Sequence, residues 1–441
     1  MGSWSWLPDR RRLLVSLVLL AAAGGAVALW GEAAWRAWLR SRLEVAVEAH
    51  DWDEARRLVD RLMTGRPPDA DLLFRKGRIM RRQGWLLEAD QLLLAAQSLG
   101  YDPVTVRQQR LLAEAQCGDI LDVEGEVLKL VNSGVDDQLA EECYEAITQG
   151  YVNSYRAEEA ARTIDFWLKW TPENSLAHYW QGKVHEMAEK WADALVRYRR
   201  ALEIEPRSYA ALLAVARMEA ETAAVDDASR NFRECLRRQP EDGMAMLGLA
   251  TCGLKVGQEG EARELLYDAL ALDIKPTDQA KVVVELAQLA LEDGAAQRSE
   301  ALAALAVARD PQSTRCRLVH AGALARLGRA EEAAAEQTTA RELSEMEVRL
   351  TDIGRKSLVN PENADLRADA GELLMGRGLE LEGARWYEIA LQIDPRHERS
   401  RRALAAFEER RGDLKRAAMH RSFLPADGPA GSEPTPPAEA P

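Results

Sequence analysis

The sequence predicts an all-α protein in which helix pairs stack into one elongated solenoid. The first observation is a sequence period. Pro206 and Pro240 are separated by the same interval at which similar residues recur at the positions between them. The second is composition, because aromatic residues make up only 6% of the 441 residues and no window shows the period-two alternation of a half-buried strand. A fixed period of about 34 residues indicates a repeated helix–turn–helix unit, so we expect a single domain and no sheet.

Small and large side chains recur at fixed positions of each unit. Gly182, Ala216 and Ala250 share one phase, and each step is one period. The other phases are Ala194, Ala228 and Ala262, then Tyr198, Phe232 and Leu266, and finally Ala201, Cys235 and Ala269. Small residues allow two helices to approach closely, and the large residue that follows fills the gap between them. The spacing therefore describes how each pair packs.

This pattern resembles the tetratricopeptide repeat (TPR), most plainly in residues 175–206, where Gly182, Trp191, Tyr198 and Pro206 lie at the expected positions. The resemblance extends over residues 36–423 in about ten units, and it implies a right-handed superhelix that binds other proteins. The chain is similar to the bacterial membrane-anchored type of this family. Some members of that type regulate lipopolysaccharide synthesis and end in a metal-binding cysteine module, which this sequence lacks.

Two stretches depart from the regular period. Residues 104–172 keep the phase of the repeat but lack its small and aromatic markers, although we still expect helices there. Further on, Ala340 and Ala390 should differ by one period but lie well over one period apart, and residues 330–359 contain no proline. The simplest interpretation of this second stretch is one helix about 45 Å long. It is either a tolerated insertion or a hinge or docking arm.

The N-terminus predicts a membrane anchor. A short basic segment, residues 1–12, ends in three consecutive arginines and precedes an uncharged apolar run over residues 13–30. A helix of this length nearly spans the hydrocarbon core of a bilayer, and tryptophans lie near both of its ends. The same order also suits a cleaved secretory signal with Ala26, Val27 and Ala28 at its cleavage site. The contiguous arginines favour a cytoplasmic N-terminus, which in either case places the repeats in a periplasm-like space.

Composition limits the remaining possibilities. The formal net charge of −14 argues against nucleic-acid binding, which needs a basic face. Five cysteines cannot all pair and include no CxxC motif, so we expect buried small hydrophobic residues rather than a disulfide framework. Residues 424–441 are rich in proline and alanine and predict a disordered tail.

No motif in the sequence indicates catalysis, a metal or a cofactor. His185 and Glu186 begin a pattern like that of a zinc-protease helix, but Glu189 stands where the second histidine is needed. His178 and His185 lie two turns apart on one predicted helix, which is too far to bind one ion. We therefore expect a protein that is not an enzyme. A remote alternative is the substrate-recruiting arm of an enzyme.

The family resemblance places the binding surface on the concave face. In this family the first helix of each unit lines that face, which implies a groove over the three central units. The groove residues are Tyr179, Lys183, Met187, Leu213, Arg217, Met244, Leu247 and Lys255. An apolar stripe edged by cations suits an amphipathic helix or an extended peptide with acidic groups. The alternative is that these side chains only pack within and between repeats.

A second candidate surface lies closer to the predicted anchor. Four arginines, Arg75, Arg78, Arg81 and Arg82, follow one another on a predicted first helix. They form a basic patch that would suit an acidic partner or anionic lipid headgroups. Ordinary solvated charge is the alternative.

These features predict a function in binding rather than in chemistry. We expect a membrane-tethered scaffold or adaptor that mediates protein–protein interaction in the assembly of an envelope complex. If the leader is cleaved, the chain is instead an exported periplasmic chaperone or secretion accessory protein.

Overall fold

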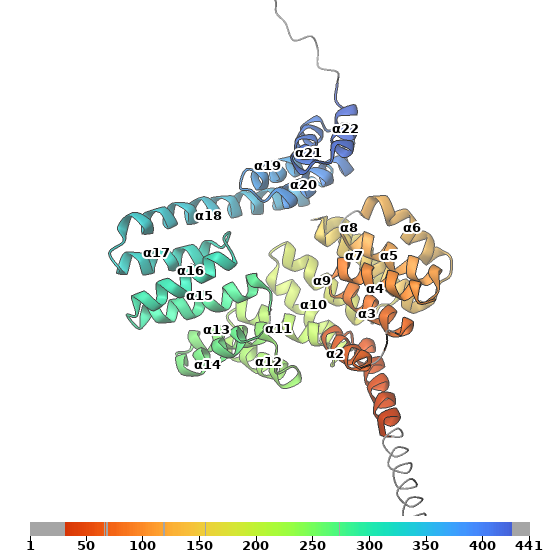
Figure 1. Cartoon of the computed structure of the whole chain (residues 1–441), viewed down its shortest axis with the longest axis horizontal. Coiled ribbons are helices and arrows are strands. Elements are labelled where there is room, and N and C mark those ends of the chain that lie inside the picture. The colour runs from red at the N-terminus through yellow and green to blue at the C-terminus, as the bar shows by residue number, and fades with distance from the viewer. Residues whose placement is uncertain are drawn as a thin grey trace, which may run out of the picture.

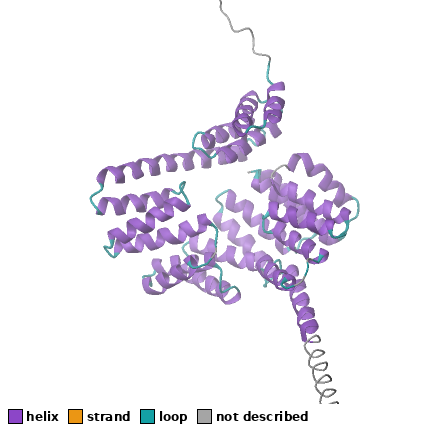
Figure 2. Cartoon of the chain, viewed as in Figure 1, coloured by secondary structure: helices purple, strands orange, loops and turns teal. Residues whose placement is uncertain are grey.

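The computed structural model of the chain describes residues 31–425 except 66, 68, 118–119, 155 and 273. All regular secondary structure in this part of the chain is helical, as the sequence predicts (Figure 2). None of the described helices is long and apolar enough to cross a membrane. The predicted anchor at residues 13–30 and nearly all of the predicted tail lie outside the described residues.

A helix through residues 31–48 is followed by α2 to α22, which fold back on one another as pairs (Figure 1). The first of them are α2 (Trp52–Met63), α3 (Ala70–Arg82), α4 (Leu86–Ser98), α5 (Pro103–Cys117), α6 (Ile120–Asn132), α7 (Asp137–Asn153), α8 (Ala157–Trp170), α9 (Ser175–Met187), α10 (Trp191–Ile204) and α11 (Tyr209–Glu221). The others are α12 (Val225–Arg238), α13 (Gly243–Lys255), α14 (Glu259–Leu270), α15 (Pro276–Glu292), α16 (Ala296–Arg309), α17 (Thr314–Arg326), α18 (Ala330–Val359), α19 (Ala364–Met375), α20 (Glu380–Ile393), α21 (Glu398–Arg411) and α22 (Leu414–Ser422). The described residues thus form eleven pairs, where the sequence predicts about ten.

In the three central units the start of the first helix is set by a capping side chain. Asn174, Ser208 and Asp242 precede α9, α11 and α13, and each side chain accepts a hydrogen bond from a backbone N–H of the first turn. Such caps satisfy N–H groups that have no partner within the helix. The three caps lie one period apart, so the period of the sequence is the period of the helix starts.

The turn between the two helices of a pair requires a left-handed backbone. Glu189, Ala223 and Gly257 occupy this turn in three successive units, with φ of 55°, 63° and 78°. Only glycine adopts such a φ without steric cost from a Cβ atom. Most of the other left-handed positions in the described chain are glycines, and the units of Glu189 and Ala223 carry local strain.

The core lies between the helices of each pair and between neighbouring pairs. A Cβ atom added at Gly182 would lie 2.6 Å from the ring of Tyr198, and one added at Gly371 would lie 2.9 Å from the ring of Tyr387. The small residue on the first helix therefore receives the aromatic ring of the second, as the spacing predicts. Tyr198 is fully buried and Tyr387 nearly so.

Both irregular stretches of the sequence are helical. The stretch that lacks the repeat markers forms α5 to α8. The stretch without a proline forms α18, a single helix over Ala330–Val359, so this prediction is confirmed. Its first half packs on α17 and its second half on α19 (Figure 1).

Contacts between distant units close a turn of the superhelix. Nε2 of Gln239, just after α12, donates to Oδ1 of Asp51 at 2.9 Å across 188 residues of sequence. The ammonium of Lys275 lies 5.5 Å from the ring centre of Trp85. In Figure 1, α2 accordingly lies beside α11 and α12. The start of the described chain therefore rests against its middle units.

We expect two glycine substitutions to have opposite effects on stability. A Cβ atom at Gly257 or at Gly260 meets no atom within 4 Å, so only backbone conformation matters. Gly257→Ala should lower the free energy of unfolding by about 1 kcal/mol, because φ is 78°. Gly260→Ala, within α14, should raise it by about 0.5 kcal/mol through helix propensity. Thermal unfolding followed by circular dichroism measures both, and shifts of the same sign would contradict this account.

A candidate binding pocket beside a buried charge cluster

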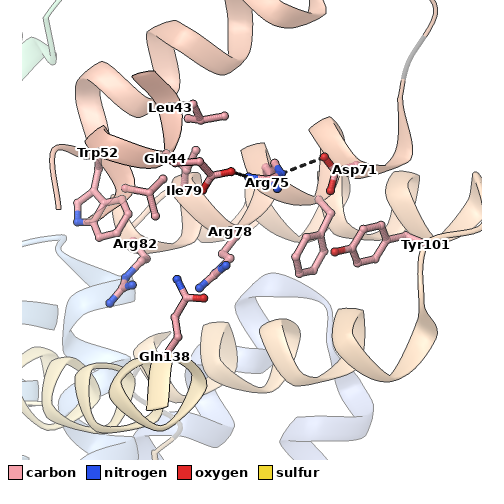
Figure 3. Close-up of a pocket in the computed structure, with 12 residues that line it drawn as sticks. Leu43, Glu44, Trp52, Asp71, Arg75, Arg78, Ile79, Arg82, Tyr101 and Gln138 are labelled. Carbon is pink, nitrogen blue, oxygen red and sulfur yellow. Dashed lines mark hydrogen bonds and ion pairs between the residues drawn. The ribbon is translucent and has the colours of Figure 1, made fainter. Parts of the chain in front are cut away.

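A pocket of about 180 Å³ opens between helix 31–48 and α3 (Figure 3). Its remaining walls come from the start of α2, from the residues before α5 and from the start of α7. The lining residues are Leu43, Glu44, Val47, Trp52, Asp71, Phe74, Arg75, Arg78, Ile79, Arg82, Tyr101 and Gln138. The pocket therefore combines an apolar floor with a rim of charged and amide groups.

Aromatic rings form two of its walls. Phe74 and Tyr101 stack with their ring centres 4.1 Å apart. Trp52 lies under the guanidinium of Arg82, at 4.5 Å from the ring centre. Planar groups of this kind offer large contact areas at little cost in side-chain entropy.

Arg75 lies at the rim between two acids. Its Nη1 donates to Oε1 of Glu44 at 2.6 Å, and its Nε donates to Oδ2 of Asp71 at 2.9 Å. The Arg75 side chain is 38% exposed, so solvent screens both ion pairs. A ligand carboxylate could replace either acid as the partner of this guanidinium.

A charge cluster of five buried or half-buried residues lies beneath the pocket: Arg78, Arg81, Arg82, Glu142 and Glu145. Glu142 Oε1 accepts from Nε of Arg78 at 2.6 Å, and its Oε2 accepts from Nη2 of Arg81 at 2.6 Å. Nε of Arg82 donates to Oε2 of Glu145 at 2.6 Å. Arg81 and Glu142 have no exposed surface at all. The cluster joins α3 to α7, two units further along the chain.

Amide side chains of α5 complete the cluster from the unit between. Oε1 of Gln109 accepts from Nε of Arg81 at 3.0 Å, and its Nε2 donates to Oε2 of Glu142 at 2.8 Å. Oε1 of Gln116 accepts from Nη1 of Arg81 at 3.1 Å. Every nitrogen of the Arg81 guanidinium therefore has a partner, which a buried charge requires.

The prediction of an open basic patch is wrong for Arg81 and Arg82, because both are buried and paired with acids of α7. Only Arg75 and Arg78 keep partly exposed side chains on the pocket side. Figure 3 shows Arg78 opposite Gln138 in the pocket. The surface available to a partner is thus smaller and closer to neutral than four arginines in sequence indicate.

The cluster determines the protonation state of Glu142. Burial by itself raises the pKa of this carboxyl group, but the guanidiniums of Arg81, Arg78 and Arg82 outweigh burial and hold the pKa at about 2. Glu142 is therefore ionised at any physiological pH.

A second pocket, of about 360 Å³, adjoins the first and shares Val47, Arg82 and Gln138 with it. His50 and Trp170 are among its other lining residues. The His50 ring lies 3.1 Å from Oε1 of Glu141, whose other oxygen accepts from the amide of Asn174 at 2.8 Å. The two pockets together form one elongated concave surface around the start of α7.

The cations of the predicted central groove are already engaged within the chain. Glu186 accepts from Lys183 at 3.3 Å, from the hydroxyl of Tyr198 at 2.6 Å and from Arg217 at 2.7 Å. Nζ of Lys255 donates to the carbonyl of Ala220 at 3.1 Å. All three cations therefore have partners before any ligand arrives.

The apolar residues of that groove pack largely between repeats. Leu247 is only 8% exposed and belongs to the core between α13, α14 and α15. Tyr179, Leu213 and Met244 are half-buried and pack against neighbouring core clusters. Met187 is half-buried at the end of α9. For Tyr179, Leu213, Met244 and Leu247 the packing alternative describes the structure better than an open groove does.

The described residues hold no cluster suited to metal binding. No group of three or more histidine, cysteine, aspartate or glutamate side chains in this part of the chain could hold a metal ion. Cys143 and Cys235 are buried, and burial raises the pKa of each thiol to about 12. Such thiols are protonated at neutral pH and do not act as nucleophiles.

Sequence reasoning misses the two acids that organise this site. Glu142 and Glu145 are two of 72 acidic residues, and only the fold brings them to α3. Both acids lie on one face of α7, and the three arginines lie on one face of α3. This matching spacing is the signal from which the pairing could have been found.

No family model matches the chain, and no curated protein matches it. Among solved structures, yeast Tom70 is similar at 14% identity and a TM-score of 0.36, over 88% of this chain and 91% of that one. The APC/C hetero-tetramer Cut9–Hcn1 is similar at 14% identity and a TM-score of 0.48, over 83% of this chain and 66% of that one. A tetratricopeptide repeat protein from Parabacteroides merdae has 19% identity and a TM-score of 0.32, over 66% of this chain and 98% of that one.

These likenesses concern the fold alone and do not distinguish a membrane-anchored bacterial type. The tetratricopeptide-type repeat that the sequence resembles is confirmed by the paired helices, whose starts recur once per period in the central units.

We expect Glu142→Gln to destabilise the chain by about 3–5 kcal/mol, because it leaves buried guanidiniums without a counter-charge. Chemical denaturation of the full chain measures the change. Glu345→Gln, at an exposed position of α18, is the matched control and should change little. In a double-mutant cycle with Arg81→Gln, the combined loss should be smaller than the sum of the single losses. Additive losses would contradict the pairing.

The same residue should make stability depend on pH. The folded pKa of Glu142 is about 2, below its unfolded value near 4.5. Its contribution is therefore complete above pH 4.5 and is lost as the pH falls toward 2. The difference in unfolding free energy between the natural chain and Glu142→Gln should shrink over this window. Denaturant titrations at several pH values check this, and a constant difference would refute it.

Proposed function

We propose that this protein is a non-catalytic adaptor that binds a segment of another protein on its N-terminal concave surface. The observation that carries the proposal is the pocket between helix 31–48 and α3, with its apolar floor and partly exposed Arg75 and Arg78. The adjoining pocket extends this surface past Arg82 and Gln138. No metal-binding cluster in the described residues competes with this proposal.

The chemistry of the surface fits a protein segment with one apolar and one acidic side chain. Leu43, Phe74 and Ile79 offer apolar contact at the floor. At the rim, Arg75 is available to a ligand carboxylate, since Glu44 and Asp71 hold it only in half-exposed ion pairs. An open pocket that continues into a second one suits an extended peptide better than an enclosed small molecule.

We further propose that residues 13–30 hold the chain in a membrane, with the N-terminus in the cytoplasm and the repeats in a periplasm-like space. The apolar run itself supports the tether. Support also comes from helix 31–48, where Trp35 and Trp38 stack at 4.7 Å while remaining 53% and 45% exposed. Exposed tryptophans just after an apolar run suit the headgroup region of a bilayer. A tether next to the pocket would present partners in or near the membrane, as assembly of an envelope complex requires.

Fractionation tests the tether. The full chain with a C-terminal tag should remain in a carbonate-washed membrane pellet, and its mature N-terminus should be Met1 or Gly2. A soluble form that begins near Leu29 would overturn the tether and favour an exported accessory protein with a cleaved leader.

Site-specific photo-cross-linking tests the binding surface. A benzoyl-phenylalanine at Gln138, an exposed pocket residue, should yield a discrete adduct in cells, because a bound segment would lie against it. The same group at Leu87, which is exposed on the outer helix α4, is the control and should not. Arg75→Glu should remove the adduct at Gln138 without loss of helicity. Equal adducts at both positions, or an adduct indifferent to Arg75→Glu, would contradict the proposal.

A further inference from the structure

Helix α18 is too long to be only the second helix of one repeat unit. It has 30 residues, whereas α10, α12, α16 and α20 have 14 each. The proline that closes one unit recurs one period later at Pro361 and Pro395, but Pro311 and Pro361 lie almost one and a half periods apart. The interval from Pro311 to Pro361 thus exceeds one period by nearly half a period. These extra residues can form one helix but not a complete pair of helices. Helix α18 is therefore the second helix of one unit continued into the second helix of the next, whose first helix is absent.

The absence uncovers a face that is buried elsewhere. In the unit closed by Pro206, Ala194, Tyr198 and Ala201 face the first helix of their own pair, and none of them is exposed. In the unit closed by Pro311, the same positions are Ser299, Ala303 and Ala306, which are also fully buried. In the unit closed by Pro361 these positions are Arg349, Ile353 and Lys356. Arg349 and Lys356 are exposed, and Ile353 is only half-buried.

This uncovered face forms one wall of a slot of about 670 Å³. Arg349, Asp352, Ile353 and Lys356 of α18 line it. The opposite wall is α19 with its C-cap, through Asp369, Glu372, Leu373 and the C-cap residue Gly376. Both sets have the spacing i, i+3, i+4, i+7, which is one face of a helix. The slot thus lies between two helix faces, where a complete unit would hold its own first helix.

The charges of the slot are balanced except at one position. Lys356 pairs with Asp352 at 2.8 Å, and Arg399 of α21 pairs with Asp369 at 2.7 Å and with Glu372. Arg377 pairs with Glu342 at 2.8 Å. Among the described residues, Arg349 alone of these cations has no hydrogen bond or ion pair. An occupant that covers Arg349, which is now exposed to solvent, would need a carboxylate to pair with it.

We propose that this slot binds an amphipathic helix of a partner protein, with an acidic residue opposite Arg349 and aliphatic residues over Ile353 and Leu373. The partner helix takes the place of the absent first helix and completes the unit in trans. Helix-in-groove recognition of this kind uses contacts at i, i+3, i+4 and i+7, which both walls already display. The slot lies on α18 and α19, away from the N-terminal pocket, so this proposal stands independently of the proposed function.

A synthetic helix tests the proposal. The probe is a fluorescein-labelled peptide of about four helical turns whose contact stripe carries glutamate, leucine, leucine and glutamate at i, i+3, i+4 and i+7. Fluorescence anisotropy with the full chain in detergent should show saturable binding in the range of about 10 µM. Arg349→Glu should weaken binding at least about tenfold, and a peptide with lysine in place of one glutamate should prefer this variant. Ile353→Asp should weaken binding similarly.

Val348→Asp is the matched control, because Val348 is exposed on α18 and does not line the slot. It should leave binding unchanged. Circular dichroism checks that each variant is folded. If Ile353→Asp unfolds the chain, Arg349→Glu still tests the proposal, because it changes an exposed residue. Absence of saturable binding, or equal effects of Val348→Asp and Arg349→Glu, would overturn the proposal. Sedimentation equilibrium measures whether the chain forms a dimer. A dimer that Arg349→Glu disrupts would overturn the proposal, because a second copy of this chain would then occupy the slot.

Discussion

The N-terminal half of this solenoid depends on one buried carboxylate. Glu142 receives hydrogen bonds from Arg78, Arg81 and Gln109, and it thereby links three successive first helices, α3, α5 and α7. Removing these charges from water costs several kcal/mol per ion unless every polar atom is satisfied. The observed placement of the three helices gives both oxygens of Glu142 and every nitrogen of the Arg81 guanidinium a partner. The curvature of these units, and with it the position of the pocket walls, follows from that requirement.

The charge cluster also explains why the binding surface lies where it does. A buried guanidinium cannot contact a ligand. The groups that can are the partly exposed Arg75 and Arg78 and the aromatic rings around them. In the central units a single acid, Glu186, engages two of the three cations that a groove would offer, and the third, Lys255, donates to the carbonyl of Ala220. Packing between repeats takes most of the apolar groove residues there. The concave face is therefore not uniform, and its open chemistry is concentrated toward the N-terminus.

What the sequence predicts well is local and periodic. The phase of Gly182 and Tyr198 is that of a close contact within one pair, and the proline-free stretch at residues 330–359 is one helix. What it does not predict are contacts between residues in units that are not neighbours, such as Arg81 with Glu142. Four arginines on one helix therefore indicate an open patch when only the sequence is considered, because the acids that pair with three of them, Glu142 and Glu145, lie two units away. The same limit applies to groove residues, whose exposure depends on how neighbouring units stack.

The bond between Gln239 and Asp51 has a mechanical consequence. An open solenoid extends like a spring, because each unit touches only its neighbours and small rotations add along the axis. Where two coils are joined, extension has to break the joining contact first, so the segment between the joined points resists a pull as a stiff ring. The units after α18 carry no comparable bond back to α2 among the described contacts. A load applied between the two ends would therefore strain the units outside this ring first, and these include helix 31–48, which forms one wall of the N-terminal pocket.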